Sequence, residues 1–292
     1  MLRLVTPLDG SVIAEQALAL SRRLAERLSG SIELVHVVET APPRDLPIPD
    51  ARDEAERYLI EVAGHTPSTI PIQTHVLDGI AVDELLRFSD HDCDTIIVMS
   101  THGRTSLQRT PMGSVADKLV RRTSVPVLLV NAPAAVQEND LHDILVPLDG
   151  SELAETALRL AMRLAGNKAR LCLVRVIQPP DGRSPGEAAL GLAVPDTELL
   201  RDITNMAVDD ARTYLFNTAL KLREQGFTVG WEVRFGHPSN EILRASETMG
   251  SDLIVMATHG WGGLRRWTFG SVTDAVIRRG SVSVLVVPSS KP

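Results

Sequence analysis

The chain has 292 residues, 43% of them apolar and 23% charged, with a formal net charge of −7 at pH 7. This balance is that of a globular protein and excludes collagen-like, coiled-coil and disordered chains. The acidic charge and an aromatic content of 3% also argue against a nucleic-acid-binding protein, because such a protein needs cationic surfaces and stacking side chains.

The apolar pattern of the first half of the chain alternates between the spacing of strands and that of helices. The predicted strands are residues 2–7, 32–38, 72–77, 95–99 and 125–130, and the predicted helices are residues 14–28, 51–63, 82–89 and 114–122. Apolar strands joined by crossover helices form a parallel sheet that is covered on both faces. We therefore expect an α/β fold with a five-stranded, doubly wound parallel sheet of the flavodoxin or Rossmann type. Such sheets bind ligands at the carboxyl ends of their strands.

The second half of the chain repeats the first. Residues 3–25 match residues 143–165 at 13 of 23 positions, and residues 96–130 match residues 253–287 at 19 of 35 positions. We therefore predict two tandem copies of one domain, at residues 1–134 and 142–292, joined by a linker at 135–141.

The offset between the two copies grows along the chain from 140 to 157 residues, so the second copy contains an insertion. Several prolines and glycines lie in this stretch, and we place a loop over about 178–208. An apolar part of it, residues 188–194, is compatible with a lid or contact patch and equally with a surface insertion.

Cysteines and targeting signals bear on where the protein works. The two cysteines, Cys93 and Cys172, are too few for a disulfide framework or a Cys-rich zinc site, and we expect Cys172 in the core. The N-terminus lacks the ordered parts of a signal peptide, and no apolar run reaches the roughly 18 residues that cross a bilayer. We expect a cytoplasmic protein with neither membrane nor nucleic-acid partners.

A short motif after the fourth strand of each copy has the composition of an anion site. It reads MSTHG at 99–103 and MATHG at 256–260, and nine residues later Gly-Ser opens a helix, at 113–114 and 270–271. Glycine lets a ligand approach the backbone, and a helix start presents N–H groups where the helix dipole favours an anion. This predicts a phosphate site, whereas the alternative makes Ser114 and Ser271 ordinary N-caps.

Asp9 and Asp149 follow the first strand of each copy and are expected at the same sheet edge as the glycine motif. A carboxylate there can accept hydrogen bonds from an amino group or a ribose hydroxyl. The alternative role is to cap the next helix together with Ser11 or Ser151.

These features together resemble the universal stress protein family. The resemblance rests on VPLDGS at 146–151, His36-Val37-Val38, the two THG turns, the GSV segments and the closing strands, and it covers almost the whole chain as two tandem domains. The family's nucleotide-binding pattern is Gly-x2-Gly-x9-Gly-Ser/Thr. Its first glycine is replaced here by Ser100 and Ala257, where a positive φ would be strained.

The resemblance implies a regulatory module of the stress response that binds an adenine nucleotide, ATP alone or with Mg²⁺, and has no dedicated catalytic or protein metal site. It implies that adenine lies beside Asp9 and Asp149 and the backbone of Val37 and Val176, with the phosphates at the glycine motifs. The implied nucleotide-binding residues are Pro7, Leu8, Asp9, Val37, Met99, Ser100, His102, Gly103, Gly113, Ser114, Val115, Pro147, Leu148, Asp149, Val176, Met256, Ala257, His259, Gly260, Gly270, Ser271 and Val272.

Two other functions stay open, a slow ATPase and a nucleotide-free interaction scaffold with degraded sites. His102 and His259 invite an acid–base role, but neither a nucleophile motif nor a metal-binding motif accompanies them, so a structural role in the turn is favoured. The resemblance also implies that the closing strands, 125–130 and 282–287, pair with each other and make an intramolecular pseudo-dimer. A further homodimer is compatible with the sequence.

Overall fold

We analysed a computed structural model that describes residues 1–39, 48–66, 69–90, 94–101, 112–131, 141–178, 197–258 and 270–289. The first repeat alternates strands and helices as expected. Its elements are β1 (Arg3–Pro7), α1 (Val12–Leu28), β2 (Ser31–Glu39), α2 (Ile48–Gly64), β3 (Ile72–Gly79), α3 (Ala81–Ser89), β4 (Thr95–Ser100), α4 (Ser114–Arg122) and β5 (Val127–Val130).

The second repeat has the same order of elements. They are β6 (Asp143–Pro147), α6 (Glu152–Ala165), β7 (Arg170–Ile177), α8 (Thr197–Glu224), β8 (Val229–Phe235), α9 (Pro238–Met249), β9 (Leu253–Ala257), α10 (Ser271–Arg279) and β10 (Ser283–Val287). The expected loop over about 178–208 is wrong for residues 197–208, because α8 begins at Thr197. Pro195 is the last proline of that stretch, and helical spacing resumes after it, with Val208 and Ala211 buried.

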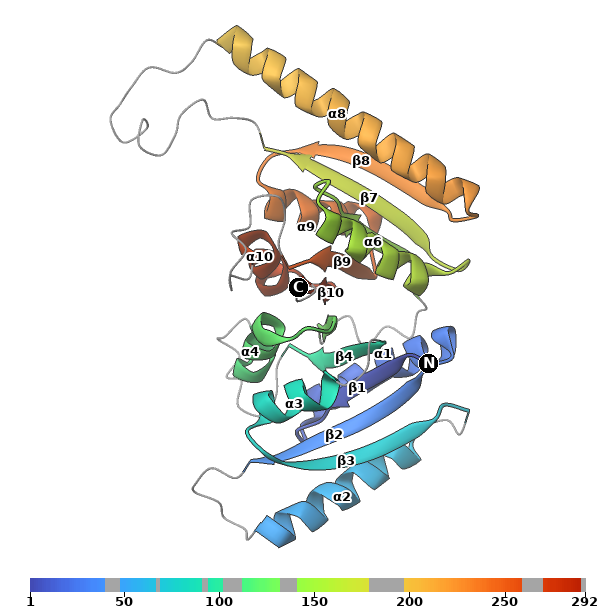
Figure 1. Cartoon of the computed structure of the whole chain (residues 1–292), viewed down its shortest axis with the longest axis vertical. Helices are drawn as coiled ribbons and strands as arrows, with labels where there is room; N and C mark the ends of the chain where they lie inside the picture. The colour runs from blue at the N-terminus through green and yellow to red at the C-terminus, as the bar shows by residue number, and fades with distance from the viewer. Residues whose placement is uncertain are drawn as a thin grey trace, which may run out of the picture.

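The ten strands of the described residues form one continuous sheet in the order β3-β2-β1-β4-β5-β10-β9-β6-β7-β8. Within each repeat the neighbouring strands are parallel, so the predicted doubly wound parallel sheets are confirmed. The two halves join where β5 and β10 pair antiparallel, with Leu128 opposite Leu285. Figure 1 shows the result: the repeats lie end to end, with α2 and α8 at opposite ends of the molecule.

Helices cover both faces of the sheet, which explains why its central strands β4, β5, β10 and β9 are buried at every position and mostly apolar. Alternate residues of β4 face opposite sides: Ile96 and Val98 belong to the core cluster that holds residues of α1, α2, α6 and α8, whereas Ile97 and Met99 belong to the cluster that holds residues of α3, α4, α9 and α10. Both core clusters run through the two repeats without interruption. Cys172 of β7 is 2% exposed, which confirms its predicted place in the core.

Polar contacts also join the repeats beside the β5–β10 pair. On the α1 and α6 side, Arg163 forms an ion pair with Asp94 of the first repeat. Arg27 donates to the backbone oxygens of Leu141, at 3.0 Å, and Ala165, at 2.6 Å. Ala165 is the last residue of α6, so this guanidinium lies at the negative end of that helix dipole. The two halves of the sheet are therefore joined by side-chain contacts as well as by strand pairing.

Candidate functional site

The predicted aspartates lie in a rigid turn directly after the first strand of each repeat. The Oδ1 atom of Asp9 accepts hydrogen bonds from the backbone N–H of Ser11, at 3.0 Å, and from its hydroxyl, at 2.6 Å. The Ser11 hydroxyl oxygen in turn accepts from the N–H of Ala14, at 3.1 Å, and caps α1. Ser11 is therefore the N-cap and Asp9 supports it, which is the shared capping arrangement that the sequence offered as an alternative, and these bonds hold the Asp9 carboxylate at the strand end.

The second repeat builds the same turn, with each hydrogen-bond distance within 0.1 Å of its counterpart. Asp149 accepts from the N–H and hydroxyl of Ser151, at 3.0 and 2.7 Å, and Ser151 caps α6. The residues before the aspartates continue the strands, since Leu8 and Leu148 donate to the carbonyl oxygens of Val35 and Val174, both at 2.8 Å. Pro7 and Pro147 end β1 and β6.

A backbone hydrogen bond in each repeat joins the residue that follows β4 or β9 to the glycine that precedes α4 or α10. The N–H of Gly113 donates to the carbonyl oxygen of Thr101, at 2.7 Å, and that of Gly270 donates to Thr258, at 2.9 Å. Thr101 and Thr258 themselves continue the sheet by donating to Val130 and Val287. Each repeat therefore holds the start of a helix, α4 or α10, against the carboxyl end of its central strand.

The serines at the starts of α4 and α10 do not cap these helices. Gly113 and Gly270 are the N-caps, with extended backbones and no side-chain capping bond. Ser114 and Ser271 are exposed first residues of the helices, so the reading of these serines as N-caps is wrong. The reason is local: the bond to the threonine carbonyl holds each glycine extended and delays the helix by one residue. A helix start without a side-chain cap suits an anion.

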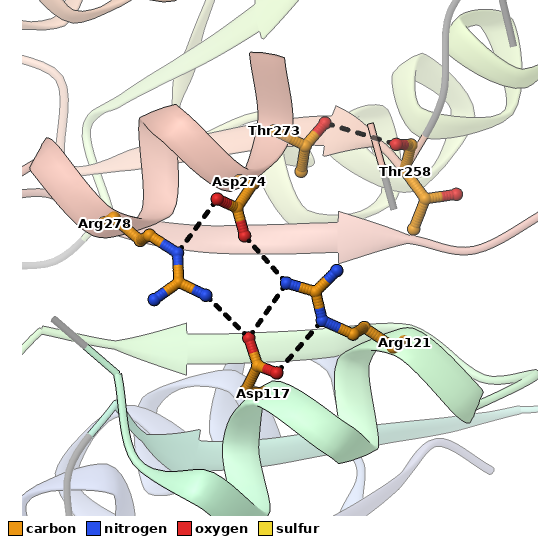
Figure 2. Close-up of polar contacts among 6 residues, drawn as sticks. All are labelled: Asp117, Arg121, Thr258, Thr273, Asp274 and Arg278. Carbon is orange, nitrogen blue, oxygen red and sulfur yellow. Dashed lines mark hydrogen bonds and ion pairs between the residues drawn. The ribbon is translucent and has the colours of Figure 1, made fainter. Parts of the chain in front are cut away.

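Replacement of the first motif glycine does not strain the backbone. Ser100 and Ala257 are the last residues of β4 and β9, and Ser29 is the one non-glycine residue with positive φ in the described part of the chain. In the second repeat the Thr273 hydroxyl donates to the carbonyl oxygen of Ala257, at 2.9 Å, and lies 3.5 Å from that of Thr258 (Figure 2). Ala116 takes that place in the first repeat and has no such donor.

The topology brings the aspartate turn and the start of α4 or α10 in each repeat to one edge of the sheet. β1 lies between β2 and β4, and β6 lies between β7 and β9, so the strand order reverses at β1 and β6. Most of the predicted residues collect at this edge, on β1, β2 and β4, on β6, β7 and β9, and at the first turns of α4 and α10. Those described are Pro7, Leu8, Asp9, Val37, Met99, Ser100, Gly113, Ser114, Val115, Pro147, Leu148, Asp149, Val176, Met256, Ala257, Gly270, Ser271 and Val272. His102, Gly103, His259 and Gly260 lie outside the described residues, as does Cys93.

The sequence reasoning missed a pair of tyrosines beside the aspartate turns. Tyr58 of α2 donates to Glu15 of α1, at 2.9 Å, and Tyr214 of α8 donates to Glu155 of α6. Burial chiefly, and then Glu155, raises the pKa of Tyr214, with a further contribution from Asp149. The signal was available, because Glu15 and Glu155 stand at equivalent places in the two copies.

The described residues lack the features of two other kinds of site. They contain no cluster of three or more histidine, cysteine, aspartate or glutamate side chains arranged to hold a metal ion. Nor does any helix among them have the length and apolarity to span a membrane.

Comparison with known proteins decides the family. The model described as the universal stress protein family matches residues 1–131 and again residues 141–288. The chain belongs to the universal stress protein family. The resemblance inferred from the sequence is thereby confirmed, and so is the tandem arrangement of two such domains.

This chain is similar over its whole length to some members of the family and over about half its length to others. Rv2005c from Mycobacterium tuberculosis is 25% identical to this chain over 313 residues, covering 98% of this chain and 97% of that protein. MJ0577 from Methanocaldococcus jannaschii is 32% identical over 152 residues, which are 49% of this chain and 93% of that protein. A universal stress protein structure from Archaeoglobus fulgidus shares the whole fold, with a TM-score of 0.72, 21% identity and 98% coverage of each chain.

Proposed function

We propose that this universal stress protein is a regulatory module that binds an adenine nucleotide, ATP, at the carboxyl edge of the sheet in each repeat. One observation carries the proposal: the same frame is built twice. In each repeat a glycine N–H bonds to a threonine carbonyl, at 2.7 or 2.9 Å, and an uncapped helix starts beside an oriented aspartate. A short helix start alone is weak support, but its repetition at the strand-order reversal is typical of a phosphate-binding edge.

In this proposal each part of the frame has one task. Asp9 and Asp149 accept hydrogen bonds from the base or ribose, next to the backbone of Val37 and Val176. The first-turn N–H groups of α4 and α10 bind the phosphates, and the THG turns complete the loop. Mg²⁺ arrives with the triphosphate, whose oxygens are the ligands it usually takes.

The regulatory part of the proposal rests on what the ligand can do. A nucleotide shifts a conformational balance only as far as it prefers one state over the other. We propose that nucleotide binding at the two sites changes the affinity of the protein for its partners in the stress response, and that this takes place in the cytoplasm.

We also propose that the two repeats, residues 1–134 and 142–292, act as an intramolecular pseudo-dimer. The antiparallel pairing of β5 with β10 supports this, because it joins equivalent strands of the two copies. Light scattering after size-exclusion chromatography tests whether two chains associate further into a homodimer.

The direct experiment is to denature freshly purified protein and to identify and count the released nucleotides by chromatography and mass spectrometry. We expect adenine nucleotide at about one or two per chain, one per frame. ATP accompanied by much ADP, with turnover of added ATP, would favour a slow ATPase instead. An empty protein that also fails to bind ATP in calorimetry would contradict the proposal and favour an interaction scaffold.

A further inference from the structure

Four charged side chains join the two repeats on the face of the sheet that carries α4 and α10 (Figure 2). We call Asp117, Arg121, Asp274 and Arg278 the inter-repeat quartet. Arg121 donates to Asp117 of its own helix through both Nε and Nη2, at 3.0 Å, and to Asp274 of the other helix through Nη2, at 3.0 Å. Each contact is within the range of a charge-assisted hydrogen bond.

The second repeat contributes the equivalent pair of contacts from its own side. Arg278 donates to Asp274 of its own helix through Nε, at 2.9 Å, and to Asp117 through Nη2, at 2.8 Å. The two arginines are 157 residues apart, as are the two aspartates, which is the offset between the copies. Each guanidinium therefore bridges one aspartate of its own repeat and one of the other.

The quartet lies next to the two helix starts where the phosphates are proposed to bind, which we call the phosphate frames. Asp117 and Asp274 are the acidic residues in the first turns of α4 and α10, the helices that begin after Gly113 and Gly270. A carboxylate in the first turn is stabilised by the helix dipole, but it repels a phosphate bound at the helix start. The pKa of Asp117 is lowered, chiefly by its hydrogen bond with Arg121, so this carboxylate is ionised at neutral pH.

The quartet is also only partly open to water, with side-chain exposures between 28% and 38%. Water and salt screen partly buried charges less than exposed ones, and networks hold more strongly than single pairs. Each first-turn aspartate therefore accepts hydrogen bonds from an arginine of its own repeat and from an arginine of the other repeat.

We propose that Arg121 and Arg278 are positioning residues that act across the repeat boundary, each supporting the phosphate frame of the opposite repeat. Arg121 offsets the charge of Asp274 and holds the first turn of α10, and Arg278 does the same for Asp117 and α4. The inference rests on the proposed nucleotide binding and adds to it that the two sites are coupled, so that neither repeat has its full affinity without the other.

The test measures ATP affinity by calorimetry when one frame is disabled. In an Asp9→Ala protein the second repeat provides the remaining site, and we expect Arg121→Gln to weaken its affinity about fivefold. The matched control is Arg122→Gln, which removes the same charge from the next position of α4. Arg122 pairs with Asp83 of its own repeat, at 2.9 Å, so we expect a change within about twofold.

The reciprocal test uses Asp149→Ala, which leaves the first repeat as the remaining site. Arg278→Gln is expected to weaken that site about fivefold. Arg279→Gln is its matched control, since Arg279 donates to Asn240 of its own repeat, at 2.8 Å. Equal affinities of the Arg121 and Arg122 variants, or of the Arg278 and Arg279 variants, would overturn the inference.

A rescue distinguishes positioning from general loosening of the interface. Adding Asp274→Asn to Arg121→Gln removes the carboxylate that Arg121 offsets, so ATP affinity of the second repeat should return to within about twofold of the Asp9→Ala parent. If the double variant stays as weak as Arg121→Gln, Arg121 does not act by offsetting the charge of Asp274, and this part of the assignment is wrong.

A nucleotide-free readout separates the failure of this inference from that of the proposed function. Arg121→Gln should speed amide hydrogen exchange at the start of α10, from Asp274 onward, where the N–H groups bond to the carbonyl oxygens of Gly270 and of the first turn, relative to Arg122→Gln. If no variant and no wild-type protein binds ATP, the proposed function fails. If exchange in α10 is the same in the two arginine variants, the coupling across the repeats is overturned whatever the nucleotide result.

Discussion

Tyr58 donates a hydrogen bond from α2 to Glu15 in the first turn of α1, with 2.9 Å between the hydroxyl oxygen and Oε1. Tyr214 and Glu155 make the equivalent bond between α8 and α6. These are the two tyrosines of the whole chain, and each serves the same pair of helices in its repeat. Glu15 and Glu155 lie in the first turns of α1 and α6, directly after the loops that contain the aspartates. Both bonds therefore hold together the helices that flank the candidate site.

Removing one of these hydroxyls should cost stability. We expect Tyr58→Phe to lower the free energy of unfolding by about 1–2 kcal/mol, because Glu15 loses a charge-assisted hydrogen bond while the ring still packs. Equilibrium urea unfolding measures this change. Ile60→Ala, on the same helix at a residue that is 64% exposed, is the control and should change stability by less than about 0.5 kcal/mol. Equal costs in the two variants would contradict the role of the bond.

The two roles of Asp9 can be separated by comparing it with its turn partner. Asp9→Ala with Asp149→Ala should weaken ATP binding at least about tenfold, because both carboxylates at the sheet edge are lost. Ser11→Ala with Ser151→Ala removes the capping hydroxyls but leaves the carboxylates. This second pair should lower stability by about 1 kcal/mol per cap and leave ATP affinity nearly unchanged. Unchanged affinity in the aspartate variants would rule out the site assignment.

The glycine frame provides an independent check of the same site. Gly113→Ala with Gly270→Ala adds a methyl group where the phosphates are proposed to approach, at residues with ordinary negative φ. We expect weaker ATP binding in calorimetry with a normal circular dichroism spectrum. Full affinity in this double variant would show that no ligand approaches the helix starts closely.

The thiol of Cys172 should be inert in the folded protein. Burial raises its pKa to about 11, so at pH 8 its thiolate is about two orders of magnitude scarcer than in the unfolded chain. Alkylation by iodoacetamide in a Cys93→Ser protein should be correspondingly slow until denaturant is added. Since the folded state holds this proton more tightly, its contribution to stability is present below about pH 8.5 and is lost as the pH rises toward 11. Rapid alkylation of the native protein would contradict the burial.

Gly79 ends β3 with a φ of +150°, a conformation that other residues rarely adopt. A Cβ atom there would also lie 2.9 Å from the Glu84 side chain. We expect Gly79→Ala to destabilise the protein by about 1 kcal/mol or more in thermal and urea unfolding. Gly64 is the control, because its φ is not positive and a Cβ atom there meets nothing within 4 Å. Gly64→Ala should leave stability unchanged or slightly raised.

Much of the candidate site could be predicted because it consists of strand ends. Carboxyl ends of parallel strands meet at one edge, so locating Asp9 and Ser100 after two strands was enough to place them together. The helix starts were harder to predict. Whether Ser114 or Gly113 is the N-cap depends on the hydrogen bond of Gly113 to Thr101, which no local pattern reveals. The start of α8 was missed because its first turns follow a stretch of prolines and glycines.

The sequence by itself determined the repeat, the order of strands and helices, and the edge where the aspartates and glycine motifs collect, because these follow from local periodicity and from the chirality of strand crossovers. The family resemblance implied that the closing strands pair, but only the tertiary structure decided their antiparallel register and the helices that meet across it. Arg121 and Asp274 are 153 residues apart, and their contact exists because β5 and β10 pair antiparallel and thereby set α4 beside α10. Such a contact depends on the register between two sheets, and each copy folds with the same local pattern whatever that register is.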